Sequence, residues 1–336
     1  MESLESTIHL APADQPESVH EITGRLFSAY ALDGGVMHLA GCMLEDRLFV
    51  RVDLRYADRT VQIHLDARGN QVGAAMVGEL GMTRTVELPR PPEDAQAEIN
   101  RLLDLGIRMA KAPFPPDAEP LEVEKAALWC KYASGKLRFT FGESSADLPF
   151  ADWGRKLVAP PFVCPYSGIS TFHLAATDDG RIAAADAMAT CEETGARVLA
   201  SELVTCSVTG RQVVPEAASR CSVCGQHVLS TELVECKMCR QSVSPATISR
   251  GRCAACRTLT PVAKDDPRVA RLLEEHAPLA RWDHWRLSET ETVYILTASG
   301  WTKRLLVVAD KESLRLSTLA EANRFFGGWV AMDSLE

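Results

Sequence analysis

Cysteines are the residues of this chain whose type and spacing are best suited to chemistry. Three Cys-x-x-Cys pairs follow one another in the second half of the chain: Cys221/Cys224, Cys236/Cys239 and Cys253/Cys256. A turn of this kind presents two sulfur atoms to one cation, and two such turns complete a tetrahedral set of four thiolates. The spacing therefore predicts a metal centre held entirely by cysteines.

The pairs belong to a repeat that extends upstream. Cys191 and Cys206 begin copies in which threonine replaces the second cysteine and glycine follows, as in Cys191-Glu-Glu-Thr194-Gly195. The first four units start 15 residues apart, the fifth starts after 17 more, and the first four carry a valine seven residues after their cysteine. A fixed period indicates one structural unit used several times. Threonine can keep the turn through local hydrogen bonds while removing a metal ligand.

Two ligand sets are compatible with this spacing. The preferred set is Cys221, Cys224, Cys236 and Cys239. The rival set is Cys236, Cys239, Cys253 and Cys256. With the preferred set, a second site would combine Cys253 and Cys256 with Cys191 and Cys206, or with His227. We expect Zn²⁺ at one site and leave a second open. Iron bound in the same kind of turn and metal-free reduced cysteines are the alternatives.

Residues 164–256 resemble tandem zinc-ribbon or zinc-knuckle modules, and the resemblance extends to no single family. Cys164-Pro165-Tyr166-Ser167-Gly168 carries the pattern further upstream. The same stretch resembles the active site of monothiol glutaredoxins, but the residues after it predict a turn and a strand rather than a helix. We therefore interpret Cys164 as part of a turn without metal. The resemblance implies short β-hairpins stabilised by zinc.

Composition supports a structural role for the metal. Residues 191–262 contain no Phe, Trp or Tyr, so this segment cannot build a large apolar core of its own. Structural zinc contributes on the order of 10–16 kcal/mol in small model peptides. We therefore expect chelation to unfold this middle region first.

Bulk composition limits the class of protein. The 336 residues are 46% hydrophobic and 24% charged, as in soluble globular proteins. No apolar run reaches the roughly 18 residues of a membrane span, and the first residues do not resemble a secretory signal. Eleven cysteines in such a chain predict reduced thiols and a cytoplasmic location. We expect no membrane partner.

Charge is distributed unevenly. The chain has a formal net charge of -9, but residues 206–257 carry seven Lys and Arg against three Asp and Glu, which gives 7 − 3 = +4. Four thiolates around one Zn²⁺ add a net charge of about −2. The basic side chains either balance this charge or contact nucleic acid, and Arg250, Arg252 and Arg257 are the candidates for such contact.

The elements around the array predict a multidomain α+β protein. It has a central zinc-ribbon-like β-hairpin array and a small β-rich C-terminal domain. The expected segments are a flexible tail (1–16), an α+β domain (17–112), a linker and β-hairpin region (113–160), the knuckle array (161–262) and a helix plus β-meander domain (263–336).

Periodicity predicts the individual elements. We expect helices near residues 19–30, from the prolines at 91 and 92 to about 107, and from Pro267. We expect strands at 48–56, 61–65, 127–132, 137–141, 293–296, 305–308 and 314–316. Ser134-Gly135 is expected to form a hairpin turn. In the C-terminal domain, the aromatic core is expected to contain Trp282, Trp285, Trp301 and Trp329.

These observations favour a non-enzymatic adaptor or scaffold for protein–protein assembly. The alternative is an accessory factor that contacts nucleic acid, or a nucleic-acid enzyme, through the array. A site closed by four thiolates leaves no position for substrate. The chain also contains no phosphate-binding glycine loop, nucleophile elbow or His-Glu-x-x-His helix, so we expect no catalytic residues and no cofactor other than metal.

Overall fold

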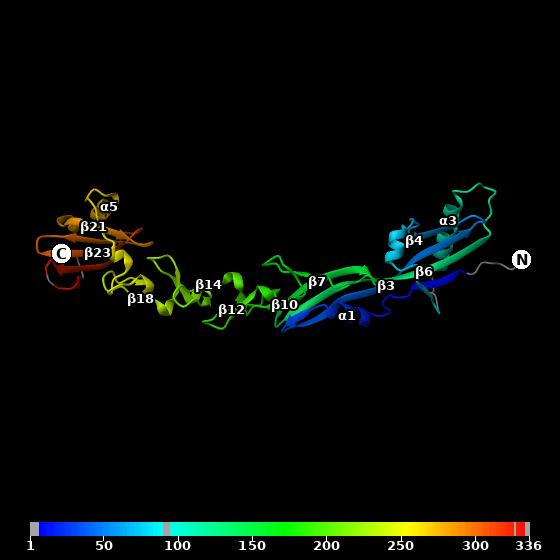
Figure 1. The fold of residues 1–336 in the computed structure, drawn as a ribbon, viewed down its shortest axis with the longest axis horizontal. Coiled ribbons are helices and arrows are strands. Elements are labelled where there is room, and N and C mark those ends of the chain that lie inside the picture. Colours follow the sequence, from blue (N-terminus) through cyan, green and yellow to red (C-terminus); the bar gives the residue numbers. More distant parts are fainter. Residues whose placement is uncertain (1–6, 90–94, 326, 333–336) are drawn as a thin grey trace. The chain divides into compact units, whose positions relative to one another are not determined.

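The computed structural model describes residues 7–89, 95–325 and 327–332. It divides into two compact units, Met1–Met188 and Ala189–Glu336, and combines helices with several sheets, which confirms the α+β class (Figure 1). Within the described residues, none of the helices has the length and apolar character needed to cross a membrane.

Two strands of 20 residues form the centre of the first unit, β3 (Val36–Arg55) and β6 (Glu122–Phe141), and they pair antiparallel. The sheet order is β4-β3-β6-β1-β5, and β7 also pairs with β6 (Figure 1). The shorter strands are β1 (Ile8–Pro12), β4 (Thr60–Asp66), β5 (Thr85–Glu87) and β7 (Ser144–Trp153). The strands predicted at 48–56 and 61–65 are thus confirmed as parts of β3 and β4.

Helix α3 (Gln96–Lys111) packs on one face of this sheet. Its buried residues include Ile99, Leu102 and Leu103. The four residues expected to open this helix, 91–94, lie outside the described residues. A separate apolar cluster lies around α2 (Ala74–Glu79) and contains Phe49 and Leu128.

The hairpin turn predicted at Ser134-Gly135 is wrong, because β6 continues through it. Opposite Gly135, strand β3 shifts register between Ala40 and Met43. A Cβ atom at Gly135 would lie 2.9 Å from the Cα of Cys42, so glycine serves here for close approach of two backbones. The hairpin turn lies instead between β6 and β7, where Gly142 has a φ of 57°.

The rest of the first unit consists of short elements. Helix α1 (Val19–Phe27) begins after Ser18, whose Oγ accepts a hydrogen bond from the backbone N–H of Glu21. One small sheet contains β2 (Ala31–Asp33), β10 (His173–Ala176) and β11 (Ile182–Ala184). Strands β8 (Phe162–Val163) and β9 (Ser170–Thr171) flank the turn of Cys164. The 3₁₀ turn η1 (Ala185–Ala187) follows β11.

Four two-stranded hairpins in succession contain the repeats. They are β12 (Met188–Thr190) with β13 (Arg197–Leu199), β14 (Val204–Thr205) with β15 (Gln212–Val213), β16 (Ala218–Arg220) with β17 (His227–Leu229), and β18 (Val234–Glu235) with β19 (Ser242–Val243). Between or after them lie the 3₁₀ turns η2 (Ala200–Glu202), η3 (Pro215–Ala217), η4 (Ser230–Glu232) and η5 (Pro245–Thr247). Each hairpin encloses one cysteine turn, so the 15-residue period corresponds to a repeated hairpin.

A six-stranded antiparallel meander completes the second unit. Its strands, in spatial and chain order, are β20 (Thr260–Pro261), β21 (Asp283–Glu289), β22 (Val293–Ser299), β23 (Lys303–Asp310), β24 (Leu316–Asn323) and β25 (Val330–Ala331). Its helical elements are α4 (Ala254–Arg257), α5 (Pro267–Glu275) and η6 (Ala277–Arg281). The predicted meander is confirmed, as is the start of α5 at Asp266-Pro267, where the Asp266 side chain caps the helix.

Alternate residues of the central strands face two different cores. Leu305 and Val307 pack with α5, Trp282 and Trp285, whereas Leu306 and Val308 face the cysteines of the array. The aromatic prediction is wrong for Trp301, because this residue lies in the turn between β22 and β23 and is 93% exposed.

Candidate metal centre

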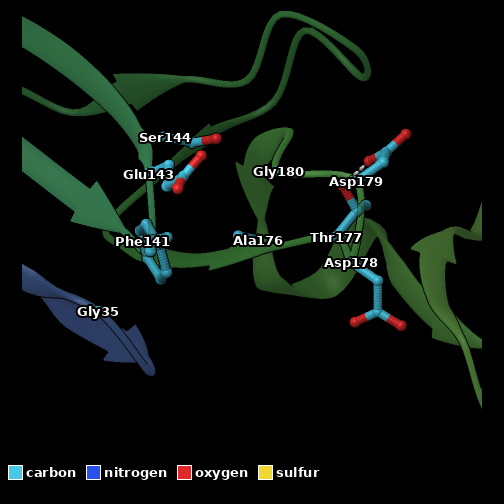
Figure 2. Close-up of a pocket in the computed structure, with 10 residues that line it drawn as sticks. Gly35, Phe141, Glu143, Ser144, Ala176, Thr177, Asp178, Asp179 and Gly180 are labelled. Carbon is cyan, nitrogen blue, oxygen red and sulfur yellow. Dashed lines mark hydrogen bonds between the residues drawn. The ribbon is translucent and has the colours of Figure 1, made fainter.

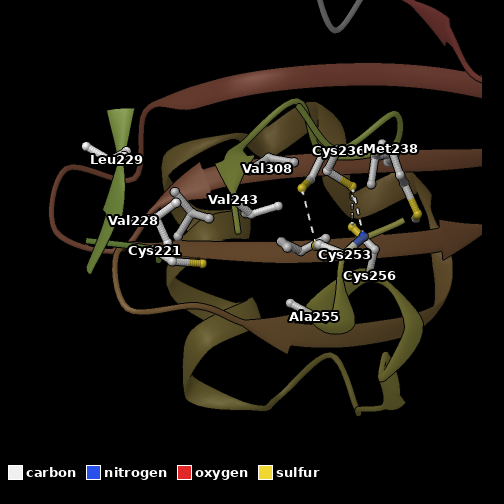
Figure 3. Close-up of a cluster of buried hydrophobic side chains, with 14 of the residues drawn as sticks. Cys221, Val228, Leu229, Cys236, Met238, Val243, Cys253, Ala255, Cys256 and Val308 are labelled. Carbon is white, nitrogen blue, oxygen red and sulfur yellow. Dashed lines mark hydrogen bonds between the residues drawn. The ribbon is translucent and has the colours of Figure 1, made fainter. Parts of the chain in front are cut away.

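Cys236, Cys239, Cys253 and Cys256 form a compact group of sulfur atoms, all within 4.8 Å of one another. The sulfurs of Cys236 and Cys256 are 3.8 Å apart (Figure 3). Those of Cys239 and Cys253 are also 3.8 Å apart. A tetrahedral ion with metal–sulfur bonds of about 2.3 Å requires sulfur–sulfur edges of about 3.8 Å. The cysteines are free thiols and all four are buried, so the group could hold a metal ion.

A hairpin turn and a short helix supply the two pairs of ligands. In the turn between β18 and β19, the N–H of Arg240 donates to the carbonyl of Cys236, and the N–H of Cys236 donates to Gln241. Cys253 lies at the N-terminus of α4, and its own N–H donates to the sulfur of Cys236 at 3.3 Å. This last hydrogen bond places the second pair against the first.

Strained backbone conformations mark both sides of the centre. Arg240 has a φ of 58°, at the position where the other turns carry glycines such as Gly225. Arg250 and Gly251 follow each other with φ values of 51° and 78°. The carbonyl of Gly251 accepts a hydrogen bond from the N–H of Lys237 at 3.0 Å. Left-handed backbone is costly for a residue with a side chain, so the surrounding structure must hold Arg240 and Arg250 in place.

The four thiols influence each other's ionisation. The hydrogen bond to Cys253 raises the pKa of Cys239 to about 12, and the pKa of Cys256 is raised by its contacts with Cys239 and Cys253. The pKa of Cys253 is lowered, because Cys239 and Cys256 donate hydrogen bonds to its sulfur. Thiolates this close repel one another, and a divalent cation would stabilise the fully deprotonated set.

The metal-ligand group is anchored to the C-terminal sheet. Its cysteines belong to one buried cluster with Ile295, Leu306 and Val308. In addition, the hydroxyl of Thr318 on β24 donates to the backbone carbonyl of Cys239 at 3.3 Å. An ion bound here would therefore fix the end of the array on one face of the meander.

The structure assembles the rival ligand set and not the preferred one. In the described residues, Cys221 and Cys224 take no part in any group of three or more metal ligands. The sulfur of Cys221 is buried and accepts a hydrogen bond from the N–H of Ser244 at 3.2 Å. Cys224 is exposed. The spacing could not reveal this, because both sets satisfy the same motif and α4 decides between them.

Cys191 and Cys206, expected for a second site, instead have backbone and hydroxyl partners. The sulfur of Cys191 accepts from the N–H of Val214 at 3.4 Å, and that of Cys206 accepts from the N–H of Leu229 at 3.4 Å. Burial opposes ionisation, but hydrogen bonds from Thr194 and Val214 lower the pKa of Cys191 to about 7. Cys206 has the same pKa of about 7, lowered against its burial by Thr209 and Leu229.

The remaining expected residues also lie outside the metal-ligand group. His227 is exposed on β17 and accepts, through its backbone carbonyl, a hydrogen bond from the N–H of Ser207. Cys164 is buried in a turn of the same form, which the N–H of Gly168 closes onto the Cys164 carbonyl. Burial opposes ionisation of Cys164 too, but hydrogen bonds from Ser167 and from the N–H of Ala184 lower its pKa.

Sequence reasoning missed a regular set of N–H···S hydrogen bonds between successive repeats. The donors to Cys191, Cys206 and Cys221 each lie 23 residues later in the chain, at Val214, Leu229 and Ser244. Each donor directly follows the repeated valine of the next unit. Each donor lies eight residues after the first cysteine of its own unit, and the units are 15 residues apart, which gives the spacing of 23. The repeated valines were therefore the signal in the sequence that could have revealed these hydrogen bonds.

Acidic side chains line several hollows in the described part of the first unit, and two of these hollows are candidates for a site. Glu143, Asp178 and Asp179 line a hollow of about 470 Å³, but Asp178 and Asp179 point in different directions, and Asp179 pairs with Arg181 (Figure 2). A larger hollow of about 970 Å³ borders Trp129 and Trp153. Acidic residues on its rim are paired as well, Asp46 with Lys131 and Glu98 with Arg101. Neither hollow offers a convergent set of metal ligands among the described residues.

Comparison of the chain with protein-family models, with curated proteins and with solved structures gives no significant match.

Proposed function

We propose that this protein is a non-enzymatic adaptor or scaffold for protein–protein assembly, and that Cys236, Cys239, Cys253 and Cys256 bind one structural Zn²⁺. The observation that carries the proposal is the closure of the group. All four candidate ligands come from one chain and at most 4% of any of them is exposed. A metal so enclosed has no open position for water or substrate, and its role is to stabilise the fold.

The surroundings of the group support a scaffold. The second unit is assembled from short hairpins and a meander that share one buried cluster with the cysteines. A metal there links the last hairpin to strands β22, β23 and β24, and so fixes the surfaces that these elements expose. Rigid presentation of surface lowers the entropy lost when a partner binds.

Purification of the tagged protein from its native host, with metal measured on the same sample, tests this proposal. We expect about one zinc per chain and co-purifying proteins. The double variant Cys236→Ser/Cys253→Ser should lose both the zinc and those partners that depend on the second unit. Cys42→Ser is the matched control, since Cys42 lies outside the array, in β3. Iron in place of zinc, or metal-free protein with the same partners, would contradict the proposal.

Nucleic-acid contact is the second candidate, because cationic side chains surround the centre. Arg250, Arg252 and Lys237 are exposed, and they form no ion pair with another described residue. If they contact phosphates, binding of a 20-nucleotide RNA or DNA should weaken with salt, and the variant Arg250→Ala/Arg252→Ala/Arg257→Ala should lose it. If the protein does not bind nucleic acid at low salt, nucleic-acid contact is excluded. The cations then balance the negative charge of the thiolates.

A further inference from the structure

Cys221 and Cys224 form a Cys-x-x-Cys pair that lies outside the four-cysteine group. The structure describes all eleven cysteines of the chain, and Cys224 is the one among them that is exposed. Cys221, three residues earlier, is fully buried. An exposed thiol beside a buried one is an arrangement in which two cysteines can react one after the other with a molecule from solution.

The two thiols of this pair are in contact. Cys224 donates a hydrogen bond to the sulfur of Cys221. That sulfur also accepts from the backbone N–H groups of Val223, Cys224 and Ser244. Burial opposes ionisation of Cys221, but these donors lower its pKa, whereas burial and the contact with Cys221 raise the pKa of Cys224. Loss of one proton from the pair therefore leaves the negative charge on the buried sulfur and the remaining proton on the exposed one.

A second sulfur is not needed to form this kind of turn. In the first unit, Thr194 takes the place of Cys224, and its hydroxyl donates to the sulfur of Cys191. Thr209 has the same role in the second unit. Threonine thus meets the hydrogen-bonding requirement of the turn. Cysteine at this place adds one property, a sulfur in contact with Cys221 that can form a covalent bond with it.

The turn of Cys221 is held against its neighbours in the second unit. The N–H of Ser244, directly after β19, donates to the sulfur of Cys221 at 3.2 Å. The N–H of Glu291, between β21 and β22, donates to the carbonyl of Ser222 at 2.9 Å. Arg220 adds an ion pair with Glu291 at 3.1 Å. The sulfur of Cys221 therefore links its own hairpin to the hairpin of β18 and β19.

We propose that Cys221 and Cys224 are a redox-active dithiol that exchanges with small-molecule disulfides of the glutathione type. The site is separate from the four-cysteine group, and its chemistry does not depend on the adaptor function. A disulfide in solution can reach the exposed sulfur of Cys224, and the buried sulfur of Cys221 then completes the reaction.

The exchange needs only the atoms of the pair and of the small disulfide, written RS–SR. The sulfur of Cys224 attacks one sulfur of RS–SR and gives its proton to the Cys221 thiolate, so a mixed disulfide forms at Cys224 and RS⁻ leaves. This RS⁻ takes the proton from Cys221 and departs as RSH. The restored Cys221 thiolate attacks the sulfur of Cys224, forms the Cys221–Cys224 disulfide and expels the second RS⁻. The pair loses two electrons, and RS–SR gains them.

Oxidation should loosen the link between the third and fourth hairpins. A disulfide sulfur has no charge and is a weak acceptor, so the N–H of Ser244 loses a good hydrogen-bond partner in a fully buried position. Exchange of this amide with solvent should become at least about fivefold faster. Zinc content should not change, because the four-cysteine group contains neither Cys221 nor Cys224.

Titration of the full-length, zinc-assayed protein with oxidised and reduced glutathione tests the proposal. At each ratio, at about pH 8, free thiols are blocked with iodoacetamide after denaturation. Trypsin then releases residues 221–237, a peptide that also contains Cys236. Mass spectrometry follows the loss of two hydrogens from this peptide, and fragment ions locate the disulfide. We expect a Cys221–Cys224 disulfide that excess reduced glutathione reverses, together with faster hydrogen exchange at Ser244.

The control variant is Cys224→Thr, which carries the residue that Thr209 provides in its own unit. It should form neither the disulfide nor a glutathione adduct, and oxidised glutathione should not change exchange at Ser244. Cys221→Ser should instead retain glutathione on Cys224, because the sulfur that completes the reaction is missing.

Four results would overturn the proposal. They are a pair that stays reduced at about 10 mM oxidised glutathione, glutathione that remains on Cys224 of the unaltered protein, a disulfide between two chains, and disulfides within the four-cysteine group in place of Cys221–Cys224. Zinc loss in Cys224→Thr would also overturn it, because the pair would then be metal ligands. A zinc-loaded protein without the disulfide refutes only the dithiol. A zinc-free protein that forms it refutes the zinc scaffold but not the dithiol.

Discussion

The amide nitrogen of Leu229 lies 3.4 Å from the sulfur of Cys206, 23 residues earlier in the chain. The same relation joins Val214 to Cys191 and Ser244 to Cys221. In the fourth unit the acceptor is Cys236, and the donor is Cys253, the first cysteine of the fifth unit, a spacing of 17 residues. There the amide donor is itself a member of the metal-ligand group. The first four units thus use their first cysteine as a hydrogen-bond acceptor, and only the fourth and fifth units supply candidate metal ligands.

Replacement of Cys206 should weaken the array without changing its metal content. Cys206→Ala leaves the buried N–H of Leu229 without an acceptor and removes a buried sulfur, at a cost of about 1–3 kcal/mol in the free energy of unfolding. Hydrogen exchange at Leu229 and zinc analysis on the same sample measure both effects. The matched control is Cys224→Thr, which should be nearly neutral because Thr194 and Thr209 occupy the same place in their units. Loss of zinc in either variant would show that these cysteines are ligands after all.

Removal of one ligand from the four-cysteine group should release the metal and loosen the C-terminal meander. Cys256→Ser lowers the zinc content from about one per chain toward none, because a site with three thiolates binds zinc far more weakly. Since the cysteines share a buried cluster with Ile295 and Val308, the amides of β22 and β23 should exchange faster. A chelator should have the same effect on the unaltered protein. Cys42→Ser, measured in parallel, should change neither quantity; unaltered exchange of β22 after complete zinc loss would contradict the coupling.

Stability of the array should rise between about pH 7 and pH 8.5. The pKa of Cys206 is about 7 in the folded protein, whereas an unfolded cysteine has a pKa of about 8.5. A lowered folded pKa contributes stability that is fully present above the unfolded value and is lost as the pH falls through the folded value. Cys191 behaves in the same way. Urea unfolding followed by hydrogen exchange in the array should show this slope, and Cys206→Ser should reduce it. An identical slope in the variant would exclude Cys206 as its source.

Replacement of Arg240 by glycine should relieve the backbone strain at this position. Arg240 has a φ of 58° at a position where Gly210 has a φ of 77°. Arg240→Gly should leave stability unchanged or raise it by up to about 1 kcal/mol, because relief of strain exceeds the loss of the exposed pair with Glu235. The reverse change Gly210→Ala should destabilise by about 1–2 kcal/mol through strain alone, since no atom lies within 4 Å of its added Cβ. Thermal unfolding of both variants, at unchanged zinc content, compares them directly.

The repeat and the type of its candidate ligands could be predicted from the sequence. Which cysteines come together in one group could not. Period, turn and ligand type are local properties, and Gly195 and Gly210 have the positive φ that the turn requires. The choice between two ligand sets is not local, because it depends on α4 placing Cys253 against Cys236. No spacing rule contains that information.

The largest difference between the predicted and the observed fold is the length of strands β3 and β6. Alternation of apolar residues identified parts of β3 and β6, but glycine in Ser134-Gly135 resembled a turn signal and is in fact the point where two backbones approach closely. Likewise, composition placed Trp301 in the aromatic core, whereas the turn leaves it in solvent. Both errors arise because the same residue type serves opposite purposes, and only tertiary contacts distinguish them.

The constant spacing of the N–H···S hydrogen bonds makes the array adjustable in length. Deletion of residues 206–220, one whole period, would bring Leu229 to the place of Val214 as the donor to Cys191 and leave every later unit in its own register. Whole units could be gained or lost during evolution without disturbing the four-cysteine group, while an insertion of any other length would misalign a valine and its neighbouring donor. Related chains should therefore differ in steps of 15 residues.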